Sequence, residues 1–361
     1  MRLNWFKKES FVGLDLGHHT IKAAQVERHG GHWKVTKYGT APTPENAIKD
    51  SVVLDHEAVG EAIRHLMRET GMTATNANIA VSGGTVVVRM VRIPKMPEAT
   101  LRKSIKYEAS RYVPTSVEDS YIEFEIVDEA GEGQMDVLIV AAPRELVESR
   151  MRACKAAGLK VAVVDVEAFA AYRSLIESDT ERPWSNETIA VVDIGDSGTN
   201  MSVVRSGVFS MTRTIPQGGH MFTEALRSYF KLSEEDAELG KAQLDVSELI
   251  MDGPPRENPP LRGLQPHLDD LVREIRRSLN YYQSQQTDGN KDKGVSLVLL
   301  SGGGAKMHGL ADYVGHKLAL ETRSTGVFDN SVFVNSAADG ESGVDIAVAS
   351  GLAMRAAGNA A

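Results

Sequence analysis

Cysteine is almost absent from this chain of 361 residues, which contains only Cys154. A single cysteine excludes an internal disulfide framework and is typical of a reducing compartment. Its neighbours, MRACKAAGL, predict an amphipathic helix and therefore a buried structural thiol. The sequence also lacks any run of about eighteen apolar residues, so it predicts no membrane-spanning helix. The first residues, MRLNWFKKESF, have no apolar centre and do not resemble a secretory signal, which favours a cytoplasmic protein.

An excess of positive charge is missing as well. Lys and Arg number 40 against 49 Asp and Glu, which gives a formal net charge of -9. Proteins that bind nucleic acid usually carry a basic face, so the composition argues against that class. Hydrophobic residues make up 42% of the chain, as in ordinary globular proteins, and the length is sufficient for two domains.

Several common catalytic signatures are also absent. The chain has no GxxxxGK[ST] phosphate loop and no GxGxxG fingerprint directly after a strand. It has neither the kinase signature set nor a GxSxG nucleophile turn. Its histidines occur without a cysteine cluster, so a structural zinc site is not expected.

The chain does contain one acidic hairpin motif twice. The stretches VGLDLGHHTIKAAQVE and VVDIGDSGTNMSVV each predict a buried strand, an Asp-aliphatic-Gly turn and a second strand. Aligning Asp15 with Asp193 gives an offset of 178 residues, close to half of the chain, and places Gly17 on Gly195. A repeat of this length predicts two similar α/β halves rather than an array of short units.

Such turns suit a bound nucleotide. Glycine lets the backbone approach closely, so that its N–H groups cradle phosphate oxygens. An aspartate just before the glycine can face the phosphates across a Mg²⁺ ion. A third glycine turn, Gly302 to Gly304 in LLSGGGAKMHGL, allows a ribose and base to come close to the backbone. The three turns together predict a nucleotide held between the two halves.

The rest of the chain alternates between strand-like and helix-like stretches. Apolar spacing predicts a helix over residues 56–69. Over residues 86–159 the predicted elements follow the order strand–helix–strand–strand–helix. This change of pattern predicts an inserted subdomain. The polar stretch 178–188 marks the join between the halves. Residues 233–290 are expected to be mainly helical, apart from a surface loop over residues 251–263, MDGPPRENPPLRG.

The two D-x-G hairpins, the connecting DVEAFAA and the terminal SGGGAKMHGL resemble the actin-like ATPase superfamily. More narrowly, VLIVAAPRELVESRMRACKAAGLKVAVVDVEAFA, RTIPQGGHMFTEAL and LVREIRRSLNYY resemble the PilM family. These are cytoplasmic proteins of type IV pilus machines and of related type II secretion or competence machines. The resemblance extends from about residue 11 to residue 356.

This resemblance implies an α/β, actin-like ATPase fold, with two ribonuclease-H-like lobes and an α+β subdomain inserted in the first lobe. Residues 1–85 and 160–187 are expected to form the first lobe core, called subdomain 1A, and residues 86–159 the insert, called 1C. Residues 188–232 and 295–361 are expected to form the second lobe core, called 2A, with residues 233–294 as its helical subdomain 2B.

The resemblance also implies a site for ATP and Mg²⁺ between the lobes. Glu167, in DVEAFAA, falls where relatives that hydrolyse ATP place the carboxylate that orients water, so it is the candidate catalytic residue. Asp15 and Asp193 are candidate metal ligands, and Glu238 and Lys241 are candidate ribose or base contacts. The candidate nucleotide-binding residues are Asp15, Gly17, Thr20, Lys22, Asp193, Gly195, Ser197, Thr199, Gly218, Gly219, Glu238, Lys241, Gly302, Gly303 and Gly304.

Two departures from the family pattern concern phosphate binding. His18 and His19 stand where relatives usually carry small hydroxyl residues, and Asp196 stands where they carry an uncharged residue. A like charge at about 4 Å costs about 4 kcal/mol at an effective dielectric near 20, unless Mg²⁺ or Lys22 offsets it. ATP binding and a scaffold with weakened nucleotide binding therefore both stay open, and little or no hydrolysis is expected.

PilM family members bind the N-terminal cytoplasmic segment of a PilN-like membrane protein in a groove between the first lobe and its insert. The resemblance therefore implies a cytoplasmic protein held at the inner membrane through this partner. A motor ATPase of the same machine and a second copy of the chain are further candidate partners. Nucleic acid and direct membrane insertion are not expected. The candidate partner contacts lie in KYEASRYVP and are Tyr107, Arg111, Tyr112 and Pro114.

The competing interpretation of the two tyrosines in this stretch is that they pack inside the insert's own core. For the whole chain, the favoured function is an assembly protein in which ATP biases conformation. An active ATPase or small-molecule kinase of the same superfamily is one alternative, although no motif marks a second substrate site. An FtsA-like protein that forms filaments on membranes is another. The C-terminal GLAMRAAGNAA does not resemble a basic membrane-binding helix, which disfavours it.

Overall fold

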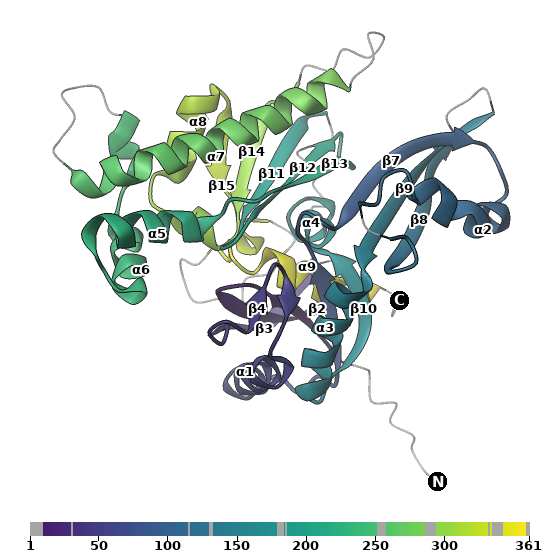
Figure 1. The fold of residues 1–361 in the computed structure, drawn as a ribbon, viewed down its shortest axis with the longest axis horizontal. Coiled ribbons are helices and arrows are strands. Elements are labelled where there is room, and N and C mark those ends of the chain that lie inside the picture. Colours follow the sequence, from purple (N-terminus) through teal and green to yellow (C-terminus); the bar gives the residue numbers. More distant parts are fainter. Residues whose placement is uncertain are drawn as a thin grey trace.

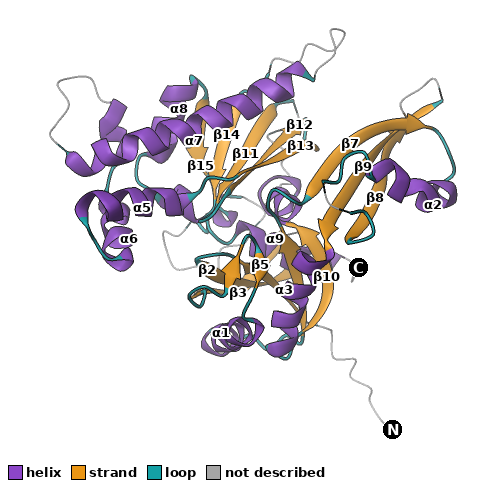
Figure 2. Cartoon of the chain, viewed as in Figure 1, coloured by secondary structure: helices purple, strands orange, loops and turns teal. Residues whose placement is uncertain are grey.

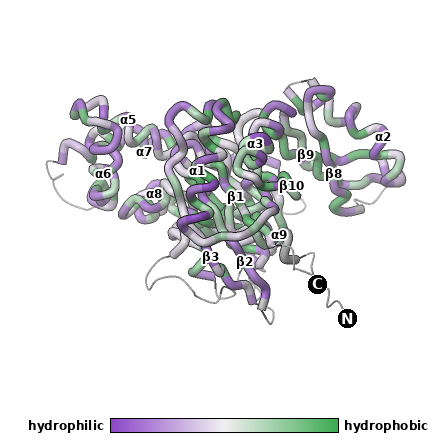
Figure 3. Tube along the Cα trace, turned by 90° about the horizontal axis from the view of Figure 1, so that it is seen from below, coloured by the Kyte–Doolittle hydropathy of each residue, from purple (hydrophilic) through white to green (hydrophobic). Residues whose placement is uncertain are grey.

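The computed structural model describes residues 10–29, 32–114, 116–129, 133–178, 184, 186–250, 258–285, 294–330, 333 and 342–358. Figure 1 shows two lobes side by side, with a smaller sheet unit containing β7, β8 and β9 projecting from them. In Figure 3, hydrophobic residues gather on the central strands around β1, whereas the outer helix α1 shows hydrophilic stretches. Each lobe is therefore organised around a buried sheet.

The first lobe is built on a five-stranded sheet with the strand order β10-β6-β1-β2-β3. The first three strands form an antiparallel meander, and β6 and β10 extend the sheet in parallel with β1. A two-stranded ribbon, β4 and β5, follows the meander. The bounds are β1 (Phe11–Leu16), β2 (Thr20–His29), β3 (His32–Pro42), β4 (Ile48–Lys49), β5 (Val52–Val53), β6 (Asn76–Val81) and β10 (Lys160–Val166).

The second lobe repeats this topology. Its sheet has the order β13-β12-β11-β14-β15, again an antiparallel meander extended by two parallel strands. Because β11 corresponds to β1 and β12 to β2, the structure confirms the repeat that aligns Asp15 with Asp193. The bounds are β11 (Thr188–Ile194), β12 (Thr199–Arg205), β13 (Val208–Ile215), β14 (Leu297–Ser301) and β15 (Glu321–Ser324).

Helices cover the sheets of both lobes (Figure 2). On the first lobe, α1 and α3 pack on one face, and α4 and α9 on the other. On the second lobe, α5, α7 and α8 share a core with β11, β12 and β14. The bounds are α1 (His56–Glu69), α3 (Arg144–Ala156), α4 (Glu167–Tyr172), α5 (Gly219–Phe230), α6 (Glu234–Gln243), α7 (Pro259–Ser284), α8 (Leu310–Leu318) and α9 (Ala347–Gly358).

Helix α9 joins the lobes, because it follows the strands of the second lobe in the chain but packs on the sheet of the first. Its contact with β1 is so close that a Cβ on Gly13 would lie 1.9 Å from the backbone oxygen of Ala349. Leu352, Ala353 and Met354 of this helix are buried. Its apolar face is therefore used inside the protein. Within the described residues, we find no helix whose length and apolar character would suit a bilayer crossing.

The insert is a three-stranded antiparallel sheet of order β7-β9-β8 with one helix packed on it. The prediction for residues 86–159 included α3 in this unit, but α3 packs against α1, and Ala153 and Cys154 lie in the core of the first lobe. We therefore propose that the insert ends at Pro143. The bounds are β7 (Val87–Pro94), α2 (Glu98–Ala109), β8 (Ser120–Glu129) and β9 (Gln134–Pro143).

The loop predicted over residues 251–263 is wrong for residues 259–263, because the prolines there were taken as the sign of a loop. Residues 251–257 lie outside the described part of the chain, as does most of the predicted join 178–188. Residues 259–263, however, begin α7, capped by Asn258, whose side chain accepts from the backbone N–H of Leu261. Proline is tolerated in a first helical turn because its missing N–H would have no partner within the helix.

Candidate functional site

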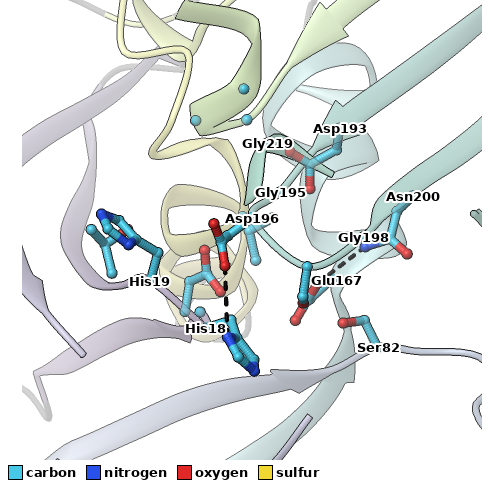
Figure 4. Close-up of a pocket in the computed structure, with 18 of the residues that line it drawn as sticks. His18, His19, Ser82, Glu167, Asp193, Gly195, Asp196, Gly198, Asn200 and Gly219 are labelled. Carbon is cyan, nitrogen blue, oxygen red and sulfur yellow. Dashed lines mark hydrogen bonds and ion pairs between the residues drawn. The ribbon is translucent and has the colours of Figure 1, made fainter. Parts of the chain in front are cut away.

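A cavity of about 710 Å³ lies between the two lobes. Its walls come from the β1–β2 turn, the β11–β12 turn, the turn after β14, and residues of α3, α4 and α6. Figure 4 shows side chains from both lobes converging on this space. The volume lies within the range of small-molecule sites, roughly 300–1,000 Å³.

Most of the predicted site residues line this cavity, but Thr199 and Gly218 do not. Thr199 is fully buried, and its hydroxyl donates to the carbonyl oxygen of Gln217 at 2.7 Å. Gly218 lies behind the second turn, against the backbone oxygen of Asp196. Both residues therefore shape the second turn instead of facing the cavity. The residues that do line it are Asp15, Gly17, Thr20, Lys22, Glu167, Asp193, Gly195, Ser197, Gly219, Glu238, Lys241, Gly302, Gly303 and Gly304.

The first hairpin carries a buried ion pair. Asp15 and Lys22 are directly opposite each other on β1 and β2, and Lys22 Nζ lies 3.0 Å from Asp15 Oδ2. Burial alone would lower the pKa of Lys22, but its attraction to Asp15 and Asp193 outweighs burial and raises the pKa above its usual value. Lys22 is therefore positively charged, and it is placed at the wall of the cavity.

The second hairpin has an amide at the equivalent position. Asn200 pairs with Asp193 across the strands, and the 178-residue offset aligns it with Lys22. Its Nδ2 donates to Glu167 Oε2 at 3.0 Å, as Figure 4 shows, and its Oδ1 accepts from the hydroxyl of Thr214 at 3.0 Å. The predicted site did not include Asn200, although the 178-residue repeat aligns it with Lys22 and could have indicated it.

Three carboxylates crowd the interior of the cavity. Burial, and then the charge of Asp15, raise the pKa of Glu167. Burial, followed by the charges of Glu167 and Asp15, raises the pKa of Asp193 to about 7. These groups repel one another in a site shielded from water, so protons or a cation are needed to offset their charge.

Glu238, Lys241 and the turn Gly302–Gly304 form a further polar part of the lining. Lys241 Nζ lies 2.7 Å from Glu238 Oε1 and 2.8 Å from the hydroxyl of Thr223. The turn Gly302–Gly304 follows β14 nearby in the lining. A side chain at Gly303 would meet nothing within 4 Å, so this turn has room for a ligand. The arrangement suits a ribose and a base.

Arg150 of α3 lines the cavity and was missed by the sequence analysis. It is 2% exposed, and its Nη1 donates to the backbone oxygens of Leu16 and Ala80, both at 3.2 Å. Its Nε donates to the backbone oxygen of Ser51 at 3.2 Å. An arginine on an amphipathic helix usually lies on the solvated face, so the local pattern gave no signal for this role.

The two residues that depart from the family pattern, one in each hairpin turn, pair with each other. His18 Nδ1 lies 3.6 Å from Asp196 Oδ2, across the cavity (Figure 4). The nearby carboxylate of Asp196 raises the pKa of His18 more than burial lowers it. Burial would raise the pKa of Asp196, but His18, His220 and His19 hold it below its usual value. From the sequence, Mg²⁺ or Lys22 was the expected partner of Asp196, whereas in the structure the partner is His18.

Acidic groups outnumber basic groups in the lining by seven to four. Among the described residues, no group of three or more His, Cys, Asp or Glu side chains is arranged to hold a metal ion. Mg²⁺ normally keeps several waters and binds one or two carboxylates together with phosphates, so these residues fit the ion only with a nucleotide. The seven are Asp15, Asp50, Glu167, Asp193, Asp196, Glu238 and Asp345, and the four are Lys22, Arg150, Lys241 and Lys306.

The candidate partner contacts lie on the surface of the insert. Tyr107 is 67% exposed and Tyr112 is 40% exposed, and the guanidinium of Arg111 lies 5.3 Å from the ring centre of Tyr107. Pro114 is also exposed. The alternative that both tyrosines fill the insert's core is therefore wrong. The core face of α2 is formed by Leu101, Ile105 and Ala109.

The chain matches the family model of the type IV pilus assembly protein PilM over residues 13–357. It is similar to a solved PilM-PilN type IV pilus biogenesis complex, with 26% identity, coverage of 96% of this chain and 98% of that chain, and a TM-score of 0.82. The ethanolamine utilization protein EutJ from Carboxydothermus hydrogenoformans is 18% identical, with 95% and 88% coverage and a TM-score of 0.57. The cell division protein FtsA of Bacillus subtilis (strain 168) is 20% identical over 263 residues, which are 65% of this chain and 58% of FtsA.

The repeated sheets, the cavity between them and these likenesses define the actin-like ATPase fold. Within that class, the chain belongs to the PilM family of type IV pilus assembly proteins. The alignment with FtsA covers less than two thirds of that relative's length.

Proposed function

We propose that this protein is an assembly component of a type IV pilus or related secretion machine. It binds the N-terminal cytoplasmic segment of a PilN-like membrane protein, which holds it at the inner membrane. The observation that carries this proposal is the likeness, over 96% of the chain, to a PilM solved in complex with PilN. The family match over residues 13–357 supports it.

The insert has the surface that such a partner requires. Exposed aromatic side chains supply contact area at a low cost in conformational entropy. We place the partner at the C-terminal end of α2, around Tyr107 and Tyr112, with Arg111 and Pro114 beside them. The insert, although it spans only residues 87–143, holds six of the thirteen large hydrophobic side chains that are exposed in the described chain: Met90, Tyr107, Tyr112, Tyr121, Ile126 and Val127.

The cavity supports ATP as a regulator of this assembly role. Lys22 and the backbone of the turns at Gly17 and Gly195 would hold the phosphates, with Asp15 and Asp193 facing a hydrated Mg²⁺. Glu238 and Lys241 would contact the ribose or base. A ligand that touches both lobes favours the arrangement that brings them together, and it biases conformation without hydrolysis.

The partner is tested with a synthetic peptide covering the N-terminal cytoplasmic segment of the PilN-like protein from the same source. Calorimetric titration should show saturable binding to the wild-type protein, because the exposed surface on α2 is intact. Tyr107→Ala and Tyr112→Ala should each weaken binding about tenfold or more, as expected for a central aromatic contact. Tyr229→Ala is the matched control, because Tyr229 is 63% exposed but lies on α5 of the second lobe. Equal effects of all three substitutions would contradict the proposed surface.

The nucleotide is tested by titration with ATP and Mg²⁺ and by a phosphate-release assay. Asp15→Ala and Asp193→Ala should abolish saturable ATP binding, while the peptide still binds. The wild-type protein should release phosphate slowly or not at all. Rapid steady-state release that depends on Glu167 would instead identify an active ATPase.

A further inference from the structure

His18 and Asp196 occupy equivalent positions of the two hairpins, because the offset that aligns Asp15 with Asp193 also aligns them. One residue follows Gly17 and the other follows Gly195, in turns that lie on opposite walls of the cavity. Their side chains are 37% and 17% exposed, and Nδ1 and Oδ2 lie 3.6 Å apart. The pair therefore bridges the lobes where the two phosphate-facing turns approach each other (Figure 4).

Charged and titratable groups surround this pair from several elements. His18 faces Asp50, in the turn between β4 and β5, as well as Asp196. Asp196 faces His220 from the first turn of α5 and His19 from the first hairpin. Three imidazoles thus lie around Asp196.

The remaining basic groups of the lining are engaged elsewhere. Lys22 pairs with Asp15, and Lys241 pairs with Glu238. Lys306 Nζ lies 2.5 Å from Asp345 Oδ2. Arg150 donates to backbone oxygens on the first lobe. The basic groups that act on Asp196 are therefore the histidines, which can offset its charge when a polyphosphate enters the cavity.

Building on the nucleotide site proposed above, we propose that His18 and Asp196 make the binding of a nucleoside polyphosphate conditional on a proton held by His18. With His18 protonated, the pair is neutral overall and the imidazolium N–H groups can face phosphate oxygens. With His18 neutral, the Asp196 carboxylate stays negative between the turns and repels the ligand. The protonation state of His18 therefore determines how tightly a charged nucleotide binds.

The direction of the pH dependence follows from the position of His18. The pKa of His18 already lies above its usual value because the Asp196 carboxylate lies beside the ring. A bound phosphate raises that pKa further, so binding takes up a proton in a pH range that begins above about 6.5. Affinity therefore falls as pH rises through that range, and we expect a loss of about tenfold between pH 6.5 and 8.5.

The test is a calorimetric titration with ADP and Mg²⁺ at several pH values from 6.0 to 9.0. Four proteins are compared: the wild type, Asp196→Asn, His18→Ser and the double variant. Asp196→Asn should bind more tightly than the wild type at pH 8.5, and its affinity should depend less on pH than that of the wild type, with the titration of Asp193 common to both proteins. His18→Ser should bind weakly throughout, because Asp196 then loses the imidazole that lies nearest to it in the opposite turn. The double variant should bind more tightly than His18→Ser and show the same reduced pH dependence as Asp196→Asn, which would show that the two residues act together.

Two controls separate the pair from other titrations. His316→Gln removes an exposed histidine of α8 that does not line the cavity, so its pH profile should match the wild type. The ionisation of ADP itself is common to all variants and cancels when they are compared. NMR titration of the His18 ring in the absence of nucleotide should give a lower pKa in Asp196→Asn than in the wild type.

The outcomes also distinguish this proposal from the nucleotide site on which it rests. Saturable wild-type binding with an affinity independent of pH would overturn the role of the pair and leave the nucleotide site intact. An unchanged His18 pKa in Asp196→Asn would overturn the pairing itself. Failure of every protein to bind ADP at any pH would overturn both the proposal and the nucleotide site, whatever the peptide does.

Discussion

Asn200 of the second lobe donates a hydrogen bond to Glu167 of the first lobe, with 3.0 Å between Nδ2 and Oε2. Asn200 on β12 is equivalent to Lys22 on β2. The same position of the two hairpins therefore has two different roles. One copy pairs a lysine with Asp15, and the other positions the carboxylate at the start of α4. The bond crosses the cavity and ties the lobes together at its inner end.

Asn200→Leu should destabilise the protein, because the buried oxygen of Glu167 loses its donor while the side-chain volume is kept. An unsatisfied buried acceptor costs about 1–3 kcal/mol. Chemical denaturation of the two proteins measures the change in the free energy of unfolding. Thr214→Val removes only the hydroxyl that orients Asn200 and should cost less. Equal stability of Asn200→Leu and the wild type would show that this bond contributes nothing.

Gly302 and Gly303 form a matched pair for separating fold from binding. Gly302 has a φ of 85°, and a Cβ there would lie 2.3 Å from Asp193 Oδ1. Gly302→Ala should therefore destabilise the second lobe by about 2 kcal/mol or more. Gly303→Ala meets no atom within 4 Å, so it should keep its melting temperature but weaken ATP binding, since the methyl group enters the cavity. Thermal unfolding and calorimetry distinguish the two effects, and a stable Gly302→Ala protein would refute the steric argument.

Much of the fold could be predicted from local signals. The repeat of the acidic hairpin gave the two equivalent sheets, and apolar spacing gave α1 with its observed bounds. The assignment of α3 to the insert was less successful, because periodicity shows that a helix has an apolar face but not which element that face contacts. The proline-rich start of α7 was likewise predicted to be a loop from its composition. Proline is tolerated in the first turn of a helix, so its position in the helix matters more than its presence.

The candidate site divides in the same way. Asp15, Asp193 and the glycine turns could be predicted because each belongs to a motif of consecutive residues. Arg150 was missed because its acceptors belong to three separate segments of the first lobe. The partner of Asp196 was also missed, since both unusual residues were weighed against a phosphate and not against each other. Pairing across 178 residues requires the lobes to be placed face to face.

Cys154 should be unreactive in the folded protein. It is fully buried between α1 and the first sheet, and burial raises the pKa of its thiol to about 12, so the reactive thiolate is scarce at neutral pH. A colorimetric thiol reagent at pH 8 should therefore react at the rate of unfolding and rapidly once denaturant is added. Because the chain has one cysteine, the signal reports this site alone. Rapid labelling under native conditions would mean that α3 detaches from the first lobe.

Arg150 should be essential to the shape of the β1–β2 turn. Its guanidinium is buried, and three backbone oxygens depend on it: Leu16 at the end of β1, Ser51 beside the β4–β5 ribbon and Ala80 on β6. Arg150→Leu should lower the free energy of unfolding by about 2–4 kcal/mol, because these three acceptors lose the bonds that the buried guanidinium supplies.

The matched control for this prediction is Arg152→Ala on the same helix. Arg152 is 50% exposed, and its Nη1 lies 3.9 Å from Glu148, so its loss should change stability by less than about 1 kcal/mol. Arg150→Lys separates charge from geometry, since lysine keeps the positive charge but lacks the planar fork that reaches three oxygens in different directions. If Arg150→Lys unfolds at the same denaturant concentration as the wild type, charge alone is sufficient. If it is destabilised almost as much as Arg150→Leu, the hydrogen bonds of the guanidinium hold β1, β6 and the ribbon in register around the cavity.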